Sequence, residues 1–160
     1  MSRIAVYPGS FDPITHGHED LIQRSLQFVD RLIVAVAVNS TKTPMFTLEE
    51  RLELLRKVLK GEARAEVQSF DGLLADFAKK SKATMVVRGL RAVSDFEYEF
   101  QMALMNRQLH PGLETVFMVP AVDLTYLSSS LVREVARLGG DVSPFVHPVV
   151  LKALQAKRGK

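Results

Sequence analysis

Residues 4–22, IAVYPGSFDPITHGHEDLI, decide the fold of this chain. The run Ile4–Tyr7 is apolar and contains β-branched residues, which is typical of a buried strand. The loop that follows holds two prolines and two glycines, and Leu21 and Ile22 then begin an apolar stripe with helical spacing. A strand, a loop and a helix in this order favour an α/β fold.

The same pattern recurs along the rest of the chain. Four further strand-like runs, each followed by a turn and a helical pattern, are Leu32–Val38, Glu66–Phe70, Thr84–Val87 and Val116–Val119. Five strands with crossover helices predict a doubly wound, Rossmann-like parallel sheet with helices on both faces. Such sheets bind ligands outside the carboxyl ends of the strands, where the strand order reverses. We therefore expect function in the strand-to-helix loops of one domain, residues 1–160.

Start signals mark several of the expected helices. Thr47 with Glu50, and Ser94 with Glu97, each have the spacing of a capping box, in which two side chains satisfy free backbone donors. Pro148 suits the first turn of a last helix, which we expect over about residues 147–156. The basic run Lys157–Lys160 after it is expected to fray.

One expected helix, starting near Phe96, has two apolar stripes. Its stripes fall on roughly opposite sides, with Phe96, Phe100, Ala103 and Leu104 on one and Tyr98, Met102, Met105 and Leu109 on the other. A surface helix needs one apolar face, so a second surface must cover it. The pattern favours contact between copies of the chain, with a helix buried twice within one subunit as the alternative.

Composition excludes several classes of protein. The chain has no cysteine, so disulfides and thiolate metal sites are impossible, and no segment approaches the roughly 18 apolar residues that a membrane span needs. The formal net charge of +3 favours anionic partners only weakly, and no basic stripe with interleaved exposed aromatics indicates nucleic-acid binding. These features predict a cytoplasmic protein without membrane or nucleic-acid partners.

The loop after Tyr7 is the strongest candidate for a site. It contains neither a G-x-G-x-x-G nor a G-x-x-x-x-G-K-[ST] motif, which disfavours dinucleotide oxidoreductases and P-loop enzymes. Gly17 and His18 instead place an imidazole at a helix N-terminus, where free N–H groups and the helix dipole favour phosphate. A lone histidine there more often caps or packs, so the neighbouring residues decide between the two interpretations.

Other residues suited to phosphate follow at similar places. Arg88 ends a predicted strand and offers a planar fork of donors, and Ser128–Ser130 stand just ahead of the helical segment Leu131–Leu138. One serine would suffice for a plain N-cap, so three favour phosphate binding. Lys42 alone would be taken for a solvated surface lysine, and Glu99 for a helix-surface carboxylate.

The motifs together resemble a known enzyme family. Thr15-His16-Gly17-His18 resembles the Thr/His-x-Gly-His signature of the nucleotidyltransferase superfamily. The likeness continues through Thr43–Thr47, Arg88–Arg91, Asp95–Glu99, Met105–Arg107 and Ser128–Glu134, and over nearly the whole chain it resembles bacterial phosphopantetheine adenylyltransferases. The resemblance implies conversion of ATP and 4′-phosphopantetheine into dephospho-coenzyme A and pyrophosphate in coenzyme A synthesis. It also implies magnesium, held mainly by the ATP phosphates, and usually a homohexamer.

The resemblance also assigns roles to single residues. Those it implies for catalysis are His18, Ser10, Lys42 and Arg91. Those it implies for ATP binding are Ser10, Phe11, His18, Gly89, Leu90, Arg91, Glu99, Leu124, Thr125, Tyr126, Leu127, Ser128, Ser129 and Ser130. Those it implies for phosphopantetheine binding are Ser10, Lys42, Leu74 and Arg88.

Two positions depart from the family pattern. Ser10 stands where many relatives have threonine, which keeps the hydroxyl, and Leu124 stands where an aromatic residue is frequent. The second departure puts stacking on adenine in doubt.

Two other functions remain open from the residues. One is a neighbouring nucleotidyltransferase acting on nicotinamide mononucleotide or glycerol phosphate. The other is a non-catalytic nucleotide-sensing or RNA-binding module on the same fold.

Overall fold

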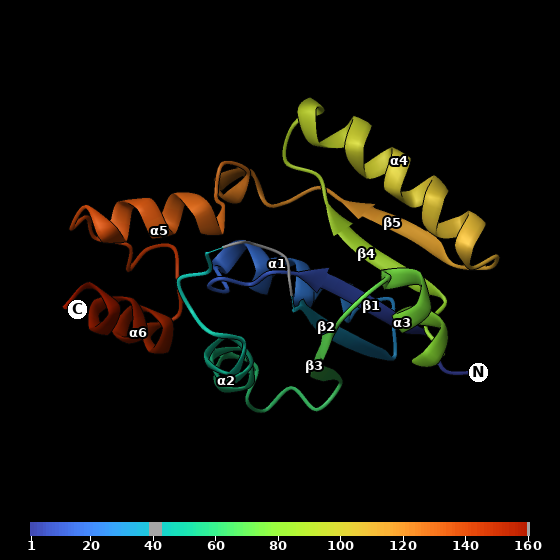
Figure 1. Cartoon of the computed structure of the whole chain (residues 1–160), viewed down its shortest axis with the longest axis horizontal. Coiled ribbons are helices and arrows are strands. Elements are labelled where there is room, and N and C mark those ends of the chain that lie inside the picture. The colour runs from blue at the N-terminus through green and yellow to red at the C-terminus, as the bar shows by residue number, and fades with distance from the viewer. Residues whose placement is uncertain (39–42, 160) are drawn as a thin grey trace.

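The computed structural model describes residues 1–38 and 43–159 and contains a five-stranded sheet (Figure 1). The strand order is β3-β2-β1-β4-β5, and all four pairings are parallel. The strands are β1 (Ile4–Gly9), β2 (Arg31–Ala37), β3 (Ala65–Phe70), β4 (Met85–Gly89) and β5 (Glu114–Met118). The predicted doubly wound α/β fold is confirmed.

Helices cover both faces of the sheet. They are α1 (His16–Ser25), α2 (Leu48–Val58), α3 (Leu74–Lys80), α4 (Val93–Leu109), α5 (Ser129–Arg137) and α6 (Pro148–Arg158), with a short 3₁₀ helix η1 (Val122–Leu124). Neighbouring residues of β2 point to opposite faces: Leu32 and Val34 join the core under α1 and α2, whereas Ile33 joins the core under α3. Burial on both faces explains why this strand is a continuous apolar run.

The strand order reverses at β1, which has β2 on one side and β4 on the other. The carboxyl ends of β1 and β4, at Gly9 and Gly89, lie at this switch point. A Cβ atom on Gly89 would lie 2.9 Å from Leu21 of α1, so glycine permits the close approach of α1 to β4. In Figure 1, α5 and α6 lie on the side toward which the strands point, and the N-terminus lies opposite.

One predicted capping box is confirmed and the other is wrong. The Thr47 N–H donates to Glu50 Oε2 (2.8 Å) and the Glu50 N–H donates to Thr47 Oγ1 (3.2 Å), and α2 follows. The box expected at Ser94 does not start α4, which begins at Val93 with Ala92 in the N-cap position. The Asp95 carboxylate accepts from the Arg91 N–H (3.3 Å), so an aspartate inside the first turn takes the role expected of Ser94 and Glu97.

The last helix begins as predicted and ends later. Pro148 occupies its first turn, and His147 Nδ1 caps it by accepting from the Val149 N–H. Helix α6 continues through Arg158, two residues beyond the expected end near residue 156, and Lys160 of the basic run lies outside the described residues. Lys157 Nζ lies 2.9 Å from Glu50 Oε1 and over the Phe46 ring, which ties α6 to α2.

Helix α4 leaves both of its apolar stripes in solvent. Its exposed side chains include Phe96, Phe100 and Leu104 from one stripe and Tyr98, Met102, Met105 and Leu109 from the other. Among its side chains from Asp95 onward, the buried ones are polar, namely Glu99 and Asn106. Burial of both stripes within one subunit is therefore wrong. No helix among the described residues has the length and apolar character required to cross a membrane.

Candidate functional site

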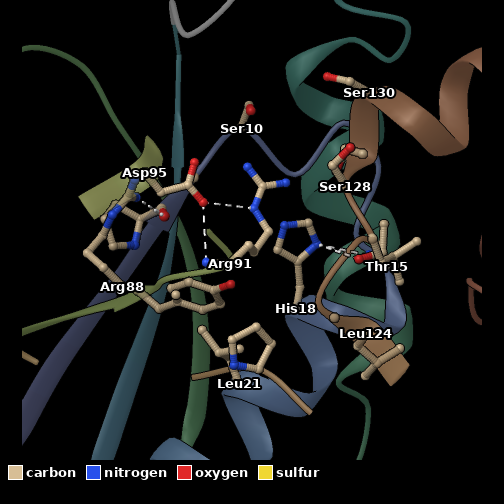
Figure 2. Close-up of a pocket in the computed structure, with 18 of the residues that line it drawn as sticks. Ser10, Thr15, His18, Leu21, Arg88, Arg91, Asp95, Leu124, Ser128 and Ser130 are labelled. Atoms are coloured by element: carbon tan, nitrogen blue, oxygen red, sulfur yellow. Dashed lines mark hydrogen bonds and ion pairs between the residues drawn. The ribbon is translucent and has the colours of Figure 1, made fainter. Parts of the chain in front are cut away.

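Two cavities meet at the carboxyl ends of β1 and β4, where the topology predicts ligands. Cavity A, about 340 Å³, lies between the β1 loop, α1, the end of β4 and the start of α5, and Figure 2 shows it. Cavity B, about 410 Å³, lies between the ends of β1 and β2, the start of α3 and helix α4. The residues that line both cavities are Pro8, Gly9, Ser10, Arg88 and Glu99. Ser10 therefore stands at the junction.

His18 projects from the first turn of α1 into cavity A (Figure 2). Its Nδ1 accepts a hydrogen bond from the Thr15 N–H at 3.0 Å and lies 3.2 Å from Thr15 Oγ1. Because a neutral imidazole that accepts at Nδ1 carries its proton on Nε2, this bond assigns Nε2–H as the group free to donate. The side chain thus caps α1 with one nitrogen and offers the other as a donor.

The surroundings keep the His18 imidazole neutral. Burial lowers the pKa of His18 to about 4, and the positive charges of Arg91 and Arg88 add to this effect. The Phe11 and Tyr7 rings pack near the imidazole, with centroids 4.9 and 6.3 Å away. At neutral pH the side chain is a hydrogen-bond donor without charge, and it is a poor proton acceptor.

Arg88 and Glu99 form an ion pair between the two cavities. Arg88 Nε donates to Glu99 Oε2 at 2.8 Å, Arg88 Nη2 donates to Glu99 Oε1, and Arg88 Nη1 donates to the Pro8 carbonyl at 3.1 Å. Burial would lower the pKa of Arg88, but the hydrogen bonds and charge of Glu99 outweigh it and raise the pKa. Glu99 is buried on α4, so its expectation as a surface carboxylate is wrong.

Arg91 supplies a second guanidinium to cavity A. Arg91 Nε and the Arg91 N–H both donate to Asp95 Oδ2 at 3.3 Å, and Figure 2 shows the guanidinium beside His18. The ion pair holds the side chain at the start of α4, and the two terminal guanidinium nitrogens make no hydrogen bond to the residues that the structure describes.

The three serines at the start of α5 line cavity A and have different partners. Ser128 is the N-cap and accepts from the Leu131 N–H at 3.1 Å. Ser129 Oγ donates to the Pro13 carbonyl at 2.7 Å, and Ser130 Oγ accepts from Arg133 Nη2 at 3.1 Å. The helix begins at Ser129, so two of the three serines lie inside its first turn.

Comparisons with known proteins decide the family. The model of the cytidylyltransferase-like family matches residues 6–135. A phosphopantetheine adenylyltransferase of Alkalilimnicola ehrlichii is 61% identical over 156 residues, covering 96% of this chain and 90% of the relative. One of Nitrosomonas eutropha is 56% identical over 153 residues, covering 96% and 93%. This chain belongs to the phosphopantetheine adenylyltransferase family.

More distant solved structures share the fold of this adenylyltransferase. The structure of a Plasmodium falciparum nicotinic acid mononucleotide adenylyltransferase superposes with a TM-score of 0.71 at 15% identity, covering 98% of this chain and 96% of that one. Nucleotidyltransferase chemistry therefore belongs to this chain through its close relatives, and the distant ones show the architecture.

Most of the adenylyltransferase residues assigned from sequence line one of the two cavities. Those on cavity A are Ser10, His18, Arg88, Gly89, Arg91, Glu99, Leu124, Leu127, Ser128, Ser129 and Ser130. Those on cavity B are Ser10, Leu74, Arg88 and Glu99. Lys42 lies outside the described residues.

Four assigned residues stand apart from the cavity walls described here. Phe11 is buried against the rings of Tyr7 and His18. The Leu90 N–H donates to the Met118 carbonyl, and Thr125 Oγ1 donates to the Val122 carbonyl. Tyr126 is exposed and meets Phe145 edge-on.

Sequence reasoning missed other residues of the cavity walls. They include Thr15, Leu21, Asp95, Pro120 and Arg133 in cavity A, and Asn106 of α4 in cavity B. Asn106 follows Glu99 by seven residues, which is two helical turns, so a polar pair on one side of the helix was a usable signal. Arg133 follows Ser130 at the i+3 spacing that brings helix side chains together.

Proposed function

We propose that this chain transfers the adenylyl group of ATP to 4′-phosphopantetheine, giving dephospho-coenzyme A and pyrophosphate. The observation that carries the proposal is the junction of two cavities at Ser10, with a neutral Nε2–H donor, His18, in one of them. ATP would occupy cavity A and phosphopantetheine cavity B, so that their phosphates meet at Ser10.

The lining of cavity A supports ATP binding. His18, Arg91, Ser128 and Ser130 offer N–H and O–H donors, whereas the Ser129 hydroxyl already donates to the Pro13 carbonyl, and the N-termini of α1 and α5 both open toward the cavity. Leu124 and Leu127 add an apolar part to the wall. Donors gathered around one space suit a polyphosphate, and an apolar wall suits a base.

The lining of cavity B supports an acceptor with one anionic end. Leu74, Val86, Met102 and Ala103 are apolar, whereas Arg88 and Ser10 lie at the junction. An uncharged pantetheine arm would contact the apolar part, and its phosphate would lie near Arg88. Lys42 is assigned to the same phosphate by the family resemblance.

Direct attack is the mechanism that these groups favour. An oxygen of the acceptor phosphate would attack the α-phosphorus of ATP in line, the bond to the oxygen bridging to the β-phosphorus would break, and pyrophosphate would leave with that electron pair. A phosphate is already anionic, so no general base is needed. His18, Arg91 and the serines would stabilise charge on the transferring and leaving phosphates.

Magnesium would enter with ATP. Among the described residues, no group of three or more His, Cys, Asp or Glu side chains is placed to hold a metal ion. We propose that the phosphate oxygens of ATP hold the ion, which supplies charge neutralisation to the polyphosphate. The residues of the chain would then bind the phosphates rather than the metal.

Helix α4 supports a homo-oligomer, and we propose a hexamer in the cytoplasm. Its exposed aromatic and aliphatic side chains, on both stripes, form a surface that a second copy would cover. Light scattering at micromolar concentration should give a mass well above 17.9 kDa, whereas a monomer would contradict this proposal.

One experiment tests the reaction. ATP, magnesium and 4′-phosphopantetheine are mixed with the protein, and dephospho-coenzyme A is sought by mass spectrometry. Parallel reactions with CTP, nicotinamide mononucleotide and glycerol phosphate distinguish the neighbouring nucleotidyltransferases. Pyrophosphate release distinguishes an enzyme from a nucleotide-sensing module. Activity with another acceptor and none with 4′-phosphopantetheine would overturn the assignment.

A further inference from the structure

A buried arginine lies behind the Ser10 loop, outside both cavity walls. Arg51, on α2, is 3% exposed. Its Nη1 donates to the Ser10 carbonyl at 2.9 Å and lies 3.4 Å from the Ala37 carbonyl. Ser10 lines both cavities and Ala37 lines cavity B, so one side chain joins the ends of β1 and β2 at the site.

The charge of Arg51 has no neutralising partner in the described part of the chain. No carboxylate among those residues lies within ion-pair distance of it, and its buried Nε has no hydrogen-bond acceptor there. A buried charge without a partner is costly, and an apolar side chain of similar volume would avoid that cost. Two backbone carbonyls orient the guanidinium but carry only partial charge.

We propose that Arg51 is a positioning residue that fixes the Ser10 and Ala37 carbonyls and lends a buried positive charge to phosphate bound at Ser10. The inference rests on the proposed function in one respect, that Ser10 contacts substrate phosphate. The anion that compensates Arg51 is then the substrate, so the charge stabilises the occupied site. Because Arg51 lies behind the loop, it acts through Ser10 and not by contact.

Two substitutions separate charge from packing. Arg51→Met keeps much of the length and volume of the side chain but removes the donors and the charge, whereas Arg51→Lys keeps the charge. We expect Arg51→Met to lower kcat by about tenfold to a hundredfold, since displacement of a positioned group by about 1 Å has effects of that size. Arg51→Lys should recover most of the loss, and ATP binding measured by calorimetry should follow the same order.

A matched control and a wild-type measurement complete the test. Leu55→Met alters the buried α2 stripe one turn further on, away from both cavities, and should leave kcat and ATP binding unchanged. In the wild-type protein, the NMR signal of the Arg51 Nε–H should shift when ATP is added, which requires no variant to fold.

The outcomes are distinct. The inference would be overturned if Arg51→Met had the kcat of the wild type, or if Arg51→Met and Arg51→Lys lost the same factor in kcat. It would also be overturned if the Arg51 Nε–H signal did not shift when ATP is added. If the wild-type protein makes no dephospho-coenzyme A, the proposed function fails, while ATP binding and the Nε–H shift still decide the role of Arg51.

Discussion

Cavity A and cavity B share the wall at Ser10, but polar side chains dominate the rest of cavity A and apolar ones the rest of cavity B. Apart from the shared Arg88, cavity A has the His18 imidazole, the guanidinium groups of Arg91 and Arg133, and three serines. Cavity B has Leu74, Val86 and Met102 around the Arg88–Glu99 pair. The difference indicates that a space suited to a polyanion adjoins one suited to an uncharged chain, across a wall that includes Ser10 and the Arg88–Glu99 pair. The predictions below test that division.

The largest effect is expected from removing the cavity A donor. His18→Ala should lower kcat by about 10²–10³-fold, equivalent to about 3–4 kcal/mol, because a preorganised donor to transition-state charge is lost. Steady-state kinetics with both substrates would measure this, and ATP binding should suffer less. Turnover within a few-fold of wild type would make His18 a helix cap alone and would remove the chemical distinction between the cavities.

Lowering the pH tests whether the His18 imidazole is neutral, through its effect on the free energy of unfolding. The His18 pKa is about 4 in the folded chain against an ordinary value near 6.5, so the folded state resists protonation. The stabilising contribution is therefore complete above pH 6.5 and is lost as the pH falls toward 4. Its size is about 3 kcal/mol. The free energy of unfolding of the wild type and of His18→Gln is measured by denaturant unfolding across this pH range. Between pH 6.5 and pH 4 it should fall by about 3 kcal/mol more for the wild type than for the variant. The same pH dependence in both proteins would contradict the neutral imidazole.

The division into two substrates is tested at the junction. Lys42→Ala and Arg88→Ala should each raise the KM for phosphopantetheine by about tenfold or more, with a smaller change for ATP, since each removes a cation proposed to face the acceptor phosphate. Arg88→Ala also strands a buried carboxylate, so Arg88→Ala with Glu99→Ala is the control that removes that cost. Equal changes in both KM values would contradict the assignment of cavities.

The smallest expected effect is none at all. If acceptor and ATP react directly across the junction, then protein, ATP and labelled pyrophosphate without acceptor should show no label in ATP. Intact-protein mass should also stay unchanged, because the neutral His18 is a poor base for activating Ser10. Acceptor-independent exchange with an AMP adduct on Ser10 would replace direct transfer by a covalent route through one cavity.

Local patterns in the sequence predicted much of this arrangement. Alternating strand and helix signals predicted the sheet, and the switch-point rule predicted ligands in the strand-to-helix loops; only the strand order of the structure identifies the ends of β1 and β4 as that point. The Thr15–His18 motif located the imidazole at the start of α1. Each of these features depends on residues that are close in the chain, where periodicity and capping chemistry can be recognised.

Features that depend on distant partners were missed. Glu99 is paired with Arg88 eleven residues away on another element, and Arg51 donates to a carbonyl forty-one residues away. Arg51 falls three residues after Leu48 and four before Leu55, on the apolar stripe of α2, so a charge at a core position was the available signal. The Ser94 box was also wrong: α4 begins at Val93, and the Asp95 carboxylate accepts from the Arg91 N–H just ahead of the helix.

The double use of His18 limits how this enzyme can be evolved. One nitrogen completes the start of α1, and the other is the proposed donor in cavity A. Glutamate is the residue that usually fills this capping position, so a search for thermal stability would favour it, yet glutamate would place a negative charge among bound phosphates. Thermal stability and turnover therefore cannot be selected independently at position 18. A library of variants made to raise thermal stability should keep His18 unchanged.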